Sequence, residues 1–534
     1  MKTKKLLLLL GIITIFLYSC STSTSPGGAA YEGPGGGREN GRFYAFDFVT
    51  EKSYSLTAEM LHEGSHCKVW AEKNMGIAVT KPIAKEVADT FDNDIYPRLI
   101  DAFGFSEPLD LGGGITKTLN SMELADFFGD GDEKLCILLM DINKGSGEDY
   151  FVAGYFDPYN FIEYDPADNY TWYSNECDMI YIDVKVKGPT NPDMFGTLAH
   201  EMQHMMNLMS SVVYRQYGSS FIDMDLWINE GLSAAAEYVG TLSHNQERIE
   251  WFNYDPTGFI TFYGNNFYMW DVGYYPENVL DDYATVYLFF QWLRLQSGGV
   301  SIYKNIINSG YDDYRAVTTA AGTAMGSKYS NWGTLLRDWL AANYINSPTS
   351  EFGYKGDLDI ILEPAKDDYD NPIKLFFLDW LCDELELEYD KTTPFVLSPG
   401  EGVYTKTTGT MPTSTTYVKY AGLDYNADAV NDTGASPVGT EEDYDSGALL
   451  SYCVATNMSY NYDSYPFSLG SAFSPEPVAG IKKMTNILPQ NHQTSLQGPY
   501  AISMGDMLKM RNAKVSFDYD PSKIIKQKVS AIHE

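Results

Sequence analysis

The stretch Gly196-Thr-Leu-Ala-His-Glu-Met-Gln-His-Met-Met-Asn207 decides the fold of the central part of the chain. Around it, apolar side chains recur at helical spacing with no internal proline: Met194, Leu198, Met202, Met205, Met206 and Met209. His200 and His204 are four residues apart on this predicted helix, so they share a face and lie about 6 Å apart along its axis. Two imidazoles in that arrangement can bind one tetrahedral Zn²⁺, with Glu201 beside the open coordination position.

A second H-E-x-x-H match, His62-Glu-Gly-Ser-His66, has a different context. From Tyr54 to Trp70, polar and apolar residues alternate on both sides of the Gly-Ser pair, which predicts a β-hairpin. Residues four apart on an extended strand are about 13 Å apart, too far to chelate one ion. We therefore interpret His62 and His66 as solvated turn residues and assign the metal to the helix at 194–209.

A catalytic zinc usually has three protein ligands and one water, so a third ligand is needed. In the metzincin class, the third ligand is a His six residues after the second His. That class also has a Gly three residues after the second His. This chain has Asn207 and Ser210 at those positions, which excludes that class. The alternative is a Glu from a following helix, and Trp227-Ile-Asn-Glu-Gly-Leu-Ser-Ala-Ala-Ala-Glu-Tyr238 is alanine-rich and favours a helix.

Two glutamates lie seven residues apart on one face of this second helix. Glu230 is the predicted third ligand, because its apolar neighbours indicate burial and a buried carboxylate needs a partner. Glu237 is predicted to orient a ligating histidine through a hydrogen bond. Glu237, Asp223 and Asp225 remain alternatives for the third ligand.

The Asn229-Glu-Gly231 tripeptide resembles that of the gluzincin metallopeptidases, in which its Glu is the third zinc ligand. The closer resemblance is to the hyicolysin-type bacterial zinc metallopeptidases, and it covers residues 43 to about 350. Besides the two helices it depends on four segments: Leu135-Cys-Ile-Leu-Leu-Met-Asp-Ile142, Val152-Ala-Gly-Tyr-Phe-Asp-Pro158, Met179-Ile-Tyr-Ile-Asp183 and Tyr283-Ala-Thr-Val-Tyr-Leu-Phe289. The resemblance implies a zincin-like α+β fold, with a mixed sheet and active-site helices, and zinc-dependent hydrolysis of peptide bonds.

The spacing of the ligands departs from that of the best-known gluzincins, because 26 positions separate His204 from Glu230. Residues 210–226 are therefore expected to form an excursion that returns Glu230 to the metal. Glu201 is the predicted general base, which accepts a proton from the zinc-activated water and delivers it to the leaving amine. The oxyanion of the intermediate needs a second donor. Tyr283, on a helix expected at 276–296, is the first choice, with Tyr287 and His244 as alternatives.

The amino terminus has the features of an exported lipoprotein. Met1-Lys-Thr-Lys-Lys5 is basic, and residues 6–18 are apolar but too short to span a bilayer as a mature helix. Leu17-Tyr-Ser-Cys20 resembles the lipobox of bacterial lipoproteins, which implies removal of a signal peptide at 1–19 and lipidation of Cys20. A plain secretory signal is the alternative. Residues 20–42, rich in Ser, Gly and Pro, are predicted to form a flexible tether. We therefore expect a protein of the bacterial cell envelope, lipid-anchored to the outer membrane and either periplasmic or surface-exposed.

The composition limits the partners. A net charge of −35 over 534 residues argues against nucleic acid. Beyond Cys20, five scattered cysteines remain, which describe neither a disulfide framework nor a Cys-ligated zinc site. Asp126-Phe-Phe-Gly-Asp-Gly-Asp-Glu133 has the oxygen ligands of a Ca²⁺-binding turn, but a polar turn before a strand explains it as well.

The residue patterns divide the chain into two expected domains. A zincin-like metallopeptidase domain is expected at 43–365, with a β-rich segment at about 43–75, a helix at about 82–103, strands to 184 and helices to about 348. A β-rich C-terminal domain is expected at 366–534, with strands at 415–420 and 449–454.

Two classes of function fit this organisation. The first is a zinc endopeptidase that acts on proteins or peptides outside the cytoplasm. The second is a non-catalytic surface lipoprotein, an adhesin or binding protein built on the same scaffold. The complete set of predicted ligands and general base favours the enzyme.

Overall fold

The computed structural model describes most of residues 41–358 and short strands beyond them. The described ranges are 41–48, 52–104, 108–110, 116–118, 134–144, 152–161, 173–185, 188–189, 191–214, 216–217, 220–221, 223–254, 265–267, 279–358, 396–397, 401–407, 418–423, 430–431, 440–442, 449–457, 467–468 and 500–502. The predicted signal peptide, the predicted tether up to residue 40 with Cys20, the candidate Ca²⁺ turn at 126–133 and the proposed domain boundary at 365 lie outside the described residues. The tether was predicted to extend to residue 42, but Arg42 is already the first residue of a strand that pairs with Thr57.

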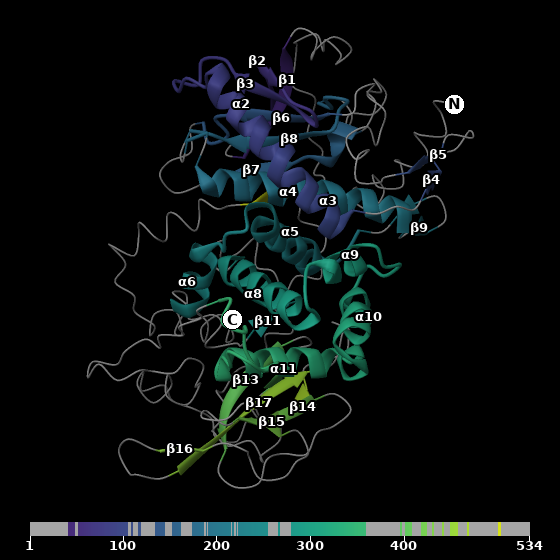
Figure 1. Ribbon diagram of the computed structural model, residues 1–534, viewed down its shortest axis with the longest axis vertical. Coiled ribbons are helices and arrows are strands. Elements are labelled where there is room, and N and C mark those ends of the chain that lie inside the picture. Colours follow the sequence, from purple (N-terminus) through teal and green to yellow (C-terminus); the bar gives the residue numbers. More distant parts are fainter. Residues whose placement is uncertain are drawn as a thin grey trace, which may run out of the picture.

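A seven-stranded mixed sheet forms the upper layer in Figure 1. Its strands follow the order β1 (Arg42–Asp47), β2 (Lys52–Glu63), β3 (Cys67–Glu72), β6 (Leu135–Met140), β8 (Met179–Asp183), β7 (Gly154–Phe156) and β19 (Tyr500–Ile502). The three central strands β3, β6 and β8 run parallel, and the other neighbours pair antiparallel. Every residue of β6 is buried, because both faces of the sheet are covered, so the strand is continuously apolar in sequence.

Alternate residues of β6 enter two separate cores. Ile137 and Leu139 belong to the larger core, whereas Leu138 and Met140 belong to the smaller one on the opposite face. The helical segments on the side of the larger core are α2 (Lys81–Thr90), the π-helical η2 (Phe91–Ile95), α3 (Tyr96–Phe103) and α4 (Pro192–Tyr214). The helix expected at 82–103 is therefore present, but a π-helical segment divides it. The mixture of α and β elements confirms the predicted α+β class.

The first H-E-x-x-H segment lies in a hairpin, as predicted. His62 is on β2, the chain turns at Ser65, and β3 pairs antiparallel with β2. The backbone N–H groups of Ser65 and His66 donate to the Asp92 carboxylate at 2.5 and 2.9 Å. The His66 ring stacks on Tyr96 with centroids 4.1 Å apart. The prediction of solvated turn residues was therefore wrong for both histidines, because His66 and the strand residue His62 are half-buried.

A helical layer lies below the sheet in Figure 1. It consists of α5 (Leu226–Thr241), α6 (Gln246–Tyr254), α8 (Val279–Ser297), α9 (Ser301–Ile307), α10 (Tyr314–Met325) and α11 (Trp332–Ile345). Two glycines allow α5 to approach its neighbours closely. A Cβ atom on Gly240 would lie 2.7 Å from the Cβ of Ala199 on α4, and one on Gly231 would lie 2.3 Å from the Phe290 ring on α8. Glycine at these positions therefore fixes α5 between α4 and α8.

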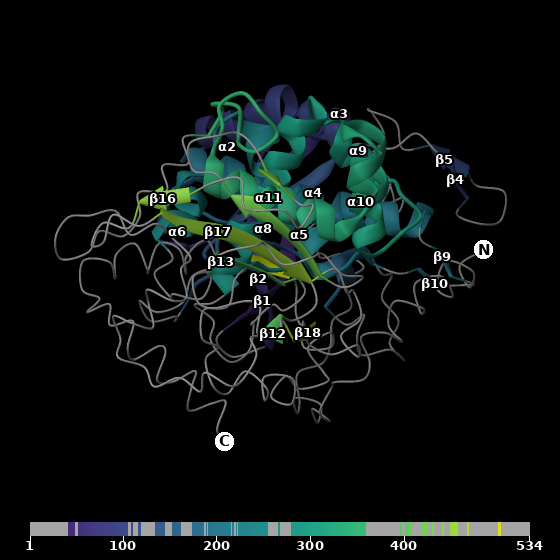
Figure 2. The same cartoon turned by 90° about the horizontal axis from the view of Figure 1, so that it is seen from below.

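A second sheet lies against α11, at the bottom of Figure 1 and in front of the helices in Figure 2. Its strands follow the order β11 (Asn265–Asn266), β13 (Glu401–Thr407), β17 (Leu449–Asn457), β14 (Val418–Leu423) and β15 (Val430–Asn431), and β16 (Thr440–Glu442) also pairs with β17. The strands expected at 415–420 and 449–454 overlap β14 and β17. In contrast, β19 pairs with β7 of the first sheet.

Short elements complete the described fold. They are β4 (Pro108–Asp110), β5 (Thr116–Thr118), η4 (Pro158–Phe161), β9 (Gln216–Tyr217), β10 (Ser220–Phe221), η6 (Ser327–Ser330), β12 (Val396–Leu397) and β18 (Phe467–Ser468). Among the residues that the structure describes, no helix has both the length and the apolar character needed to cross a bilayer.

Candidate metal centre

Two adjacent helices bring the predicted ligands together. α4 carries His200 and His204 on one face, and α5, packed beside it, carries Glu230. The three residues are 1%, 2% and 3% exposed. The excursion expected at 210–226 contains the end of α4 and the paired strands β9 and β10. Glu230 thus reaches the histidines despite its distance along the sequence.

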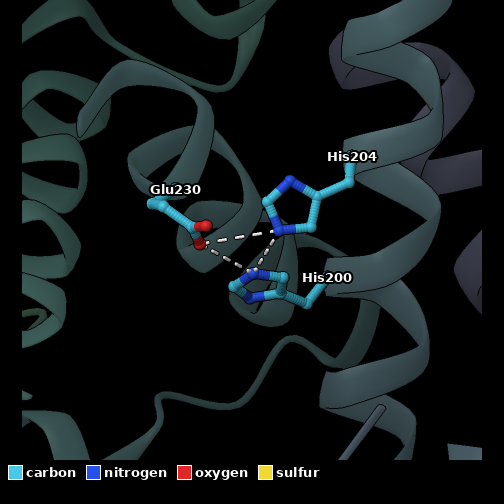
Figure 3. A group of neighbouring side chains, drawn as sticks. All are labelled: His200, His204 and Glu230. Atoms are coloured by element: carbon cyan, nitrogen blue, oxygen red, sulfur yellow. Dashed lines mark hydrogen bonds and ion pairs between the residues drawn. The ribbon is translucent and has the colours of Figure 1, made fainter. Parts of the chain in front are cut away.

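The three candidate ligand atoms form a nearly regular triangle, drawn in Figure 3. The Nε2 atoms of His200 and His204 are 3.1 Å apart, and Oε2 of Glu230 lies 3.4 and 3.5 Å from them. Three atoms bound at about 2.0–2.1 Å to one tetrahedral ion are about 3.3 Å from one another. The observed triangle therefore has the size that one such ion requires.

Hydrogen bonds at the far side of each imidazole determine which nitrogen faces the centre of the triangle. Nδ1 of His200 lies 2.8 Å from Oε1 of Glu237, which can only accept a hydrogen bond. Nδ1 of His204 lies 3.0 Å from Oδ1 of Asn229 and 3.1 Å from Oγ of Ser233. With the N–H at Nδ1 in each ring, both neutral imidazoles direct the Nε2 lone pair at Glu230.

The convergence of acceptor atoms shows that these residues fit a cation. Two nitrogen lone pairs and a carboxylate oxygen facing one another in a buried place repel unless a positive charge lies between them. The buried carboxylates of Glu230 and Glu237 exceed the buried guanidinium of Arg248 by one negative charge, and ionisation of the buried Glu201 would raise the excess to two. One divalent metal ion would balance that charge.

The carboxyl group of Glu201 is next to the ligands along the chain and is fully buried. Neither of its oxygens makes a regular hydrogen bond within the described part of the chain. Burial, followed by the charges of Glu230 and Glu237, raises its pKa well above the ordinary value, although the backbone of Phe156 acts in the opposite direction. The Glu201 carboxyl group is therefore available to accept and release a proton.

Tyr283, on α8, is 5% exposed and lies beside Glu230. Burial and the Glu230 charge raise the pKa of Tyr283 well above its ordinary value, and its hydroxyl is close enough to Glu230 to form a hydrogen bond. The structure thus places Tyr283 beside Glu230, one of the candidate ligands.

The two alternatives to Tyr283 have other partners. The Tyr287 hydroxyl lies 2.9 Å from Nδ1 of His244 and accepts from the Asn245 backbone N–H at 3.1 Å. Nε2 of His244 lies 3.1 Å from Asp357. Both groups are therefore engaged with other hydrogen-bond partners, and Asn245 connects these partners to Glu237.

The alternatives to Glu230 as third ligand also occupy other places. Glu237 contacts the outer nitrogen of His200, which matches its predicted role of orienting that ring. Asp225 is the N-cap residue of α5. Neither Asp225 nor Asp223 belongs to the candidate metal-binding group that the described residues form.

Three contacts to this site were not predicted. Asn229 and Ser233 hold His204, and Arg248, from α6, contacts Glu237. Asn229 and Ser233 are four residues apart in an Ala-rich helix, and this spacing is a signal that could have identified them. Arg248 has no comparable signal, because it reaches the site only through the fold.

Comparison with known proteins agrees with this geometry. No protein-family model matches the chain. The chain is similar to the neutral metalloprotease ShpI of Staphylococcus hyicus, with 26% identity over 324 residues. The matched region is 59% of this chain and 64% of ShpI, so the chain spans less than two thirds of that relative's length. The similarity supports a metallopeptidase family for this chain.

Proposed function

We propose that the chain is a zinc-dependent endopeptidase of the hyicolysin type, with a gluzincin-like ligand set. The observation that carries the proposal is the convergence of two Nε2 lone pairs and the Glu230 carboxylate in one buried triangle. Two imidazoles and one carboxylate form a ligand set that zinc uses in hydrolytic enzymes. His200, His204 and Glu230 would hold the ion.

The residues around the ligands can divide the work of hydrolysis. When bound, zinc supplies a water of lowered pKa and polarises the scissile carbonyl. Glu201 takes the proton of the attacking water and delivers it to the leaving nitrogen, for which its oxygens are free of regular hydrogen bonds to the described chain. Tyr283 donates its hydroxyl hydrogen to the carbonyl oxygen as that atom gains negative charge. The burial of these side chains strengthens each electrostatic contact.

We also propose that the enzyme acts on extracellular or periplasmic proteins and peptides. The N-terminal lipobox-like segment supports attachment of Cys20 to the membrane of the bacterial cell envelope. The similarity of the chain to a neutral metalloprotease supports protein or peptide substrates.

The substitution Glu201→Gln tests the proposed role of the general base. It keeps the shape of the side chain and removes the proton acceptor, so cleavage of a casein or peptide substrate should fall by about 10²–10⁴-fold. Zinc content, measured by elemental analysis, should stay near one ion per chain. Glu86→Gln, at an exposed position of α2, is the matched control and should leave both values unchanged.

Two results would contradict the proposal. Retained cleavage in Glu201→Gln would remove Glu201 from its role. A wild-type chain that holds zinc and cleaves no protein or peptide would instead favour the non-catalytic binding protein built on the same scaffold.

A further inference from the structure

Arg248 is a fully buried cation close to the metal centre, and its side chain is 1% exposed. It comes from α6, which carries none of the candidate ligands. Its Nε donates to Oε2 of Glu237 at 3.2 Å, and its Nη2 donates to Oε1 of the same carboxylate. The guanidinium therefore contacts both oxygens of Glu237, the two-bond geometry that fixes a carboxylate in orientation as well as position.

The Glu237 carboxylate in turn fixes a ligand. Its Oε1 accepts from His200 at 2.8 Å, and its Oε2 accepts from the Asn245 side chain at 2.7 Å. Each oxygen thus has two donors. Rotation of the carboxylate would break several of these bonds together and would turn the His200 ring away from the triangle.

Arg248 also contacts Tyr283, the residue beside the candidate ligand Glu230. Its guanidinium carbon lies 4.9 Å from the centroid of the Tyr283 ring, within the range of a cation–π contact. Arg248, which lies outside the two helices that carry the ligands, therefore contacts both Glu237, which orients His200, and Tyr283, the proposed oxyanion donor.

We propose that Arg248 is a positioning residue that holds Glu237 against His200 and the Tyr283 ring against the ligand cluster. The inference deepens the proposed function and rests on it. A lysine could not replace Arg248, because an ammonium group is a point charge and cannot contact both carboxylate oxygens in the same fixed plane. The geometry of the guanidinium, as well as its charge, is therefore required.

The experiment measures metal binding separately from catalysis, on the full-length chain. Zn²⁺ affinity is measured by competition with a chromophoric chelator, and the visible spectrum of the Co²⁺-loaded protein reports coordination geometry. Arg248→Lys and Arg248→Met are compared with Arg337→Met on α11, which removes another buried arginine paired with a carboxylate. The control should lose stability but keep the wild-type Zn²⁺ affinity and Co²⁺ spectrum.

Both Arg248 variants should bind Zn²⁺ about 10–100-fold more weakly, with an altered Co²⁺ spectrum, as is typical when a partner of a ligand is lost. At saturating Zn²⁺, kcat should also fall while KM changes little, because Tyr283 is displaced from a contact made in the transition state. Wild-type Zn²⁺ affinity, spectrum and kcat in Arg248→Lys would overturn the proposal. If Arg248→Met does not fold, as judged by circular dichroism, Arg248→Lys alone decides.

These measurements distinguish a failure of the role proposed for Arg248 from a failure of the proposed peptidase function. A wild-type chain that binds Zn²⁺ without cleaving peptides would refute the peptidase, and the affinity and spectrum would still support or overturn the role of Arg248. A wild-type chain with no Zn²⁺ affinity would overturn both.

Discussion

The substitution Gly231→Ala tests how α5 is held so that Glu230 reaches the metal centre. A Cβ atom at this position would lie 2.3, 2.6 and 3.0 Å from the Cε2, Cδ2 and Cζ atoms of Phe290. Carbon atoms in ordinary contact are about 3.5–4.0 Å apart. The Phe290 ring or the α5 backbone must therefore move by about 1 Å, and Phe290 is itself completely buried.

Two effects of opposite sign contribute to the stability of this variant. Helix propensity favours Ala over Gly by about 1 kcal/mol. Overpacking a buried site costs about 1–3 kcal/mol, and occasionally more. Because both partners are buried and the overlap is with ring carbons, we expect an overpacking cost in the upper part of that range, about 2–3 kcal/mol, and so a net loss of about 1–2 kcal/mol. Since Gly231 adjoins Glu230, Zn²⁺ affinity should also fall, on the order of tenfold.

The measurement is chemical unfolding in the presence of a chelator, which separates packing from metal binding. Gly196→Ala on α4 is the matched control, because its new Cβ would be 3.9 Å from the nearest atom and should show only the helix-propensity gain. Phe290→Leu should restore part of the stability lost in Gly231→Ala, with a coupling of at least about 0.5 kcal/mol. A Gly231→Ala variant as stable as the wild type, or one without coupling to Phe290, would refute the reasoning.

Three further predictions concern the metal and nearby groups. Removing the metal with a chelator should lower the Tm, because a ligand present at 100 times its Kd contributes about 2.7 kcal/mol; an unchanged Tm would contradict a metal that stabilises the fold. Tyr283→Phe should lower kcat with little change in KM or Zn²⁺ content, and unaltered kcat would exclude Tyr283 as the oxyanion donor. Burial, then Asp313 and Asp312, raise the pKa of Asp225 to about 7 from 3.8, so the native state binds this proton more tightly than the unfolded chain. Stability is therefore lost as pH rises from about 4 to 7, and Asp225→Asn should gain about 1–3 kcal/mol at pH 8 and little at pH 4, as measured by urea unfolding at the two values.

The positions of His200 and His204 on one helix face could be predicted because the signal is local. The spacing of the apolar residues distinguished the two H-E-x-x-H matches. Around His62 polar and apolar residues alternate, whereas around His200 the apolar residues recur at helical spacing. The same local reasoning predicted α8 and the strands β14 and β17. It did not predict η2, because the hydrophobic period hardly changes across five π-helical residues.

The side chains that hold the ligands were harder to predict, because their contacts depend on packing between helices. Arg248 is eleven residues from Glu237, and its position beside that carboxylate is set by how α6 packs against α8. Nothing in the sequence between these residues marks the contact. The half-burial of His66 also depends on packing between elements, because the His66 ring stacks on Tyr96 of α3.

The long interval between His204 and Glu230 has little influence on whether these two ligands can meet. Doubling the length of a connecting loop costs only about 0.6 kcal/mol in closure entropy, so an excursion of this size is a small obstacle to assembling the ligands. The close approaches at Gly240 and Gly231 have a larger effect, because a Cβ there would meet Ala199 or Phe290 at well under contact distance and would displace α5. The position of the Glu230 carboxylate is thus decided by what α5 packs against, and the spacing along the chain is weak evidence against a shared metal site. In a chain with a similar interval but bulky residues in place of these two glycines, α5 could not pack in this way, so a shared metal site would be harder to form than in this chain.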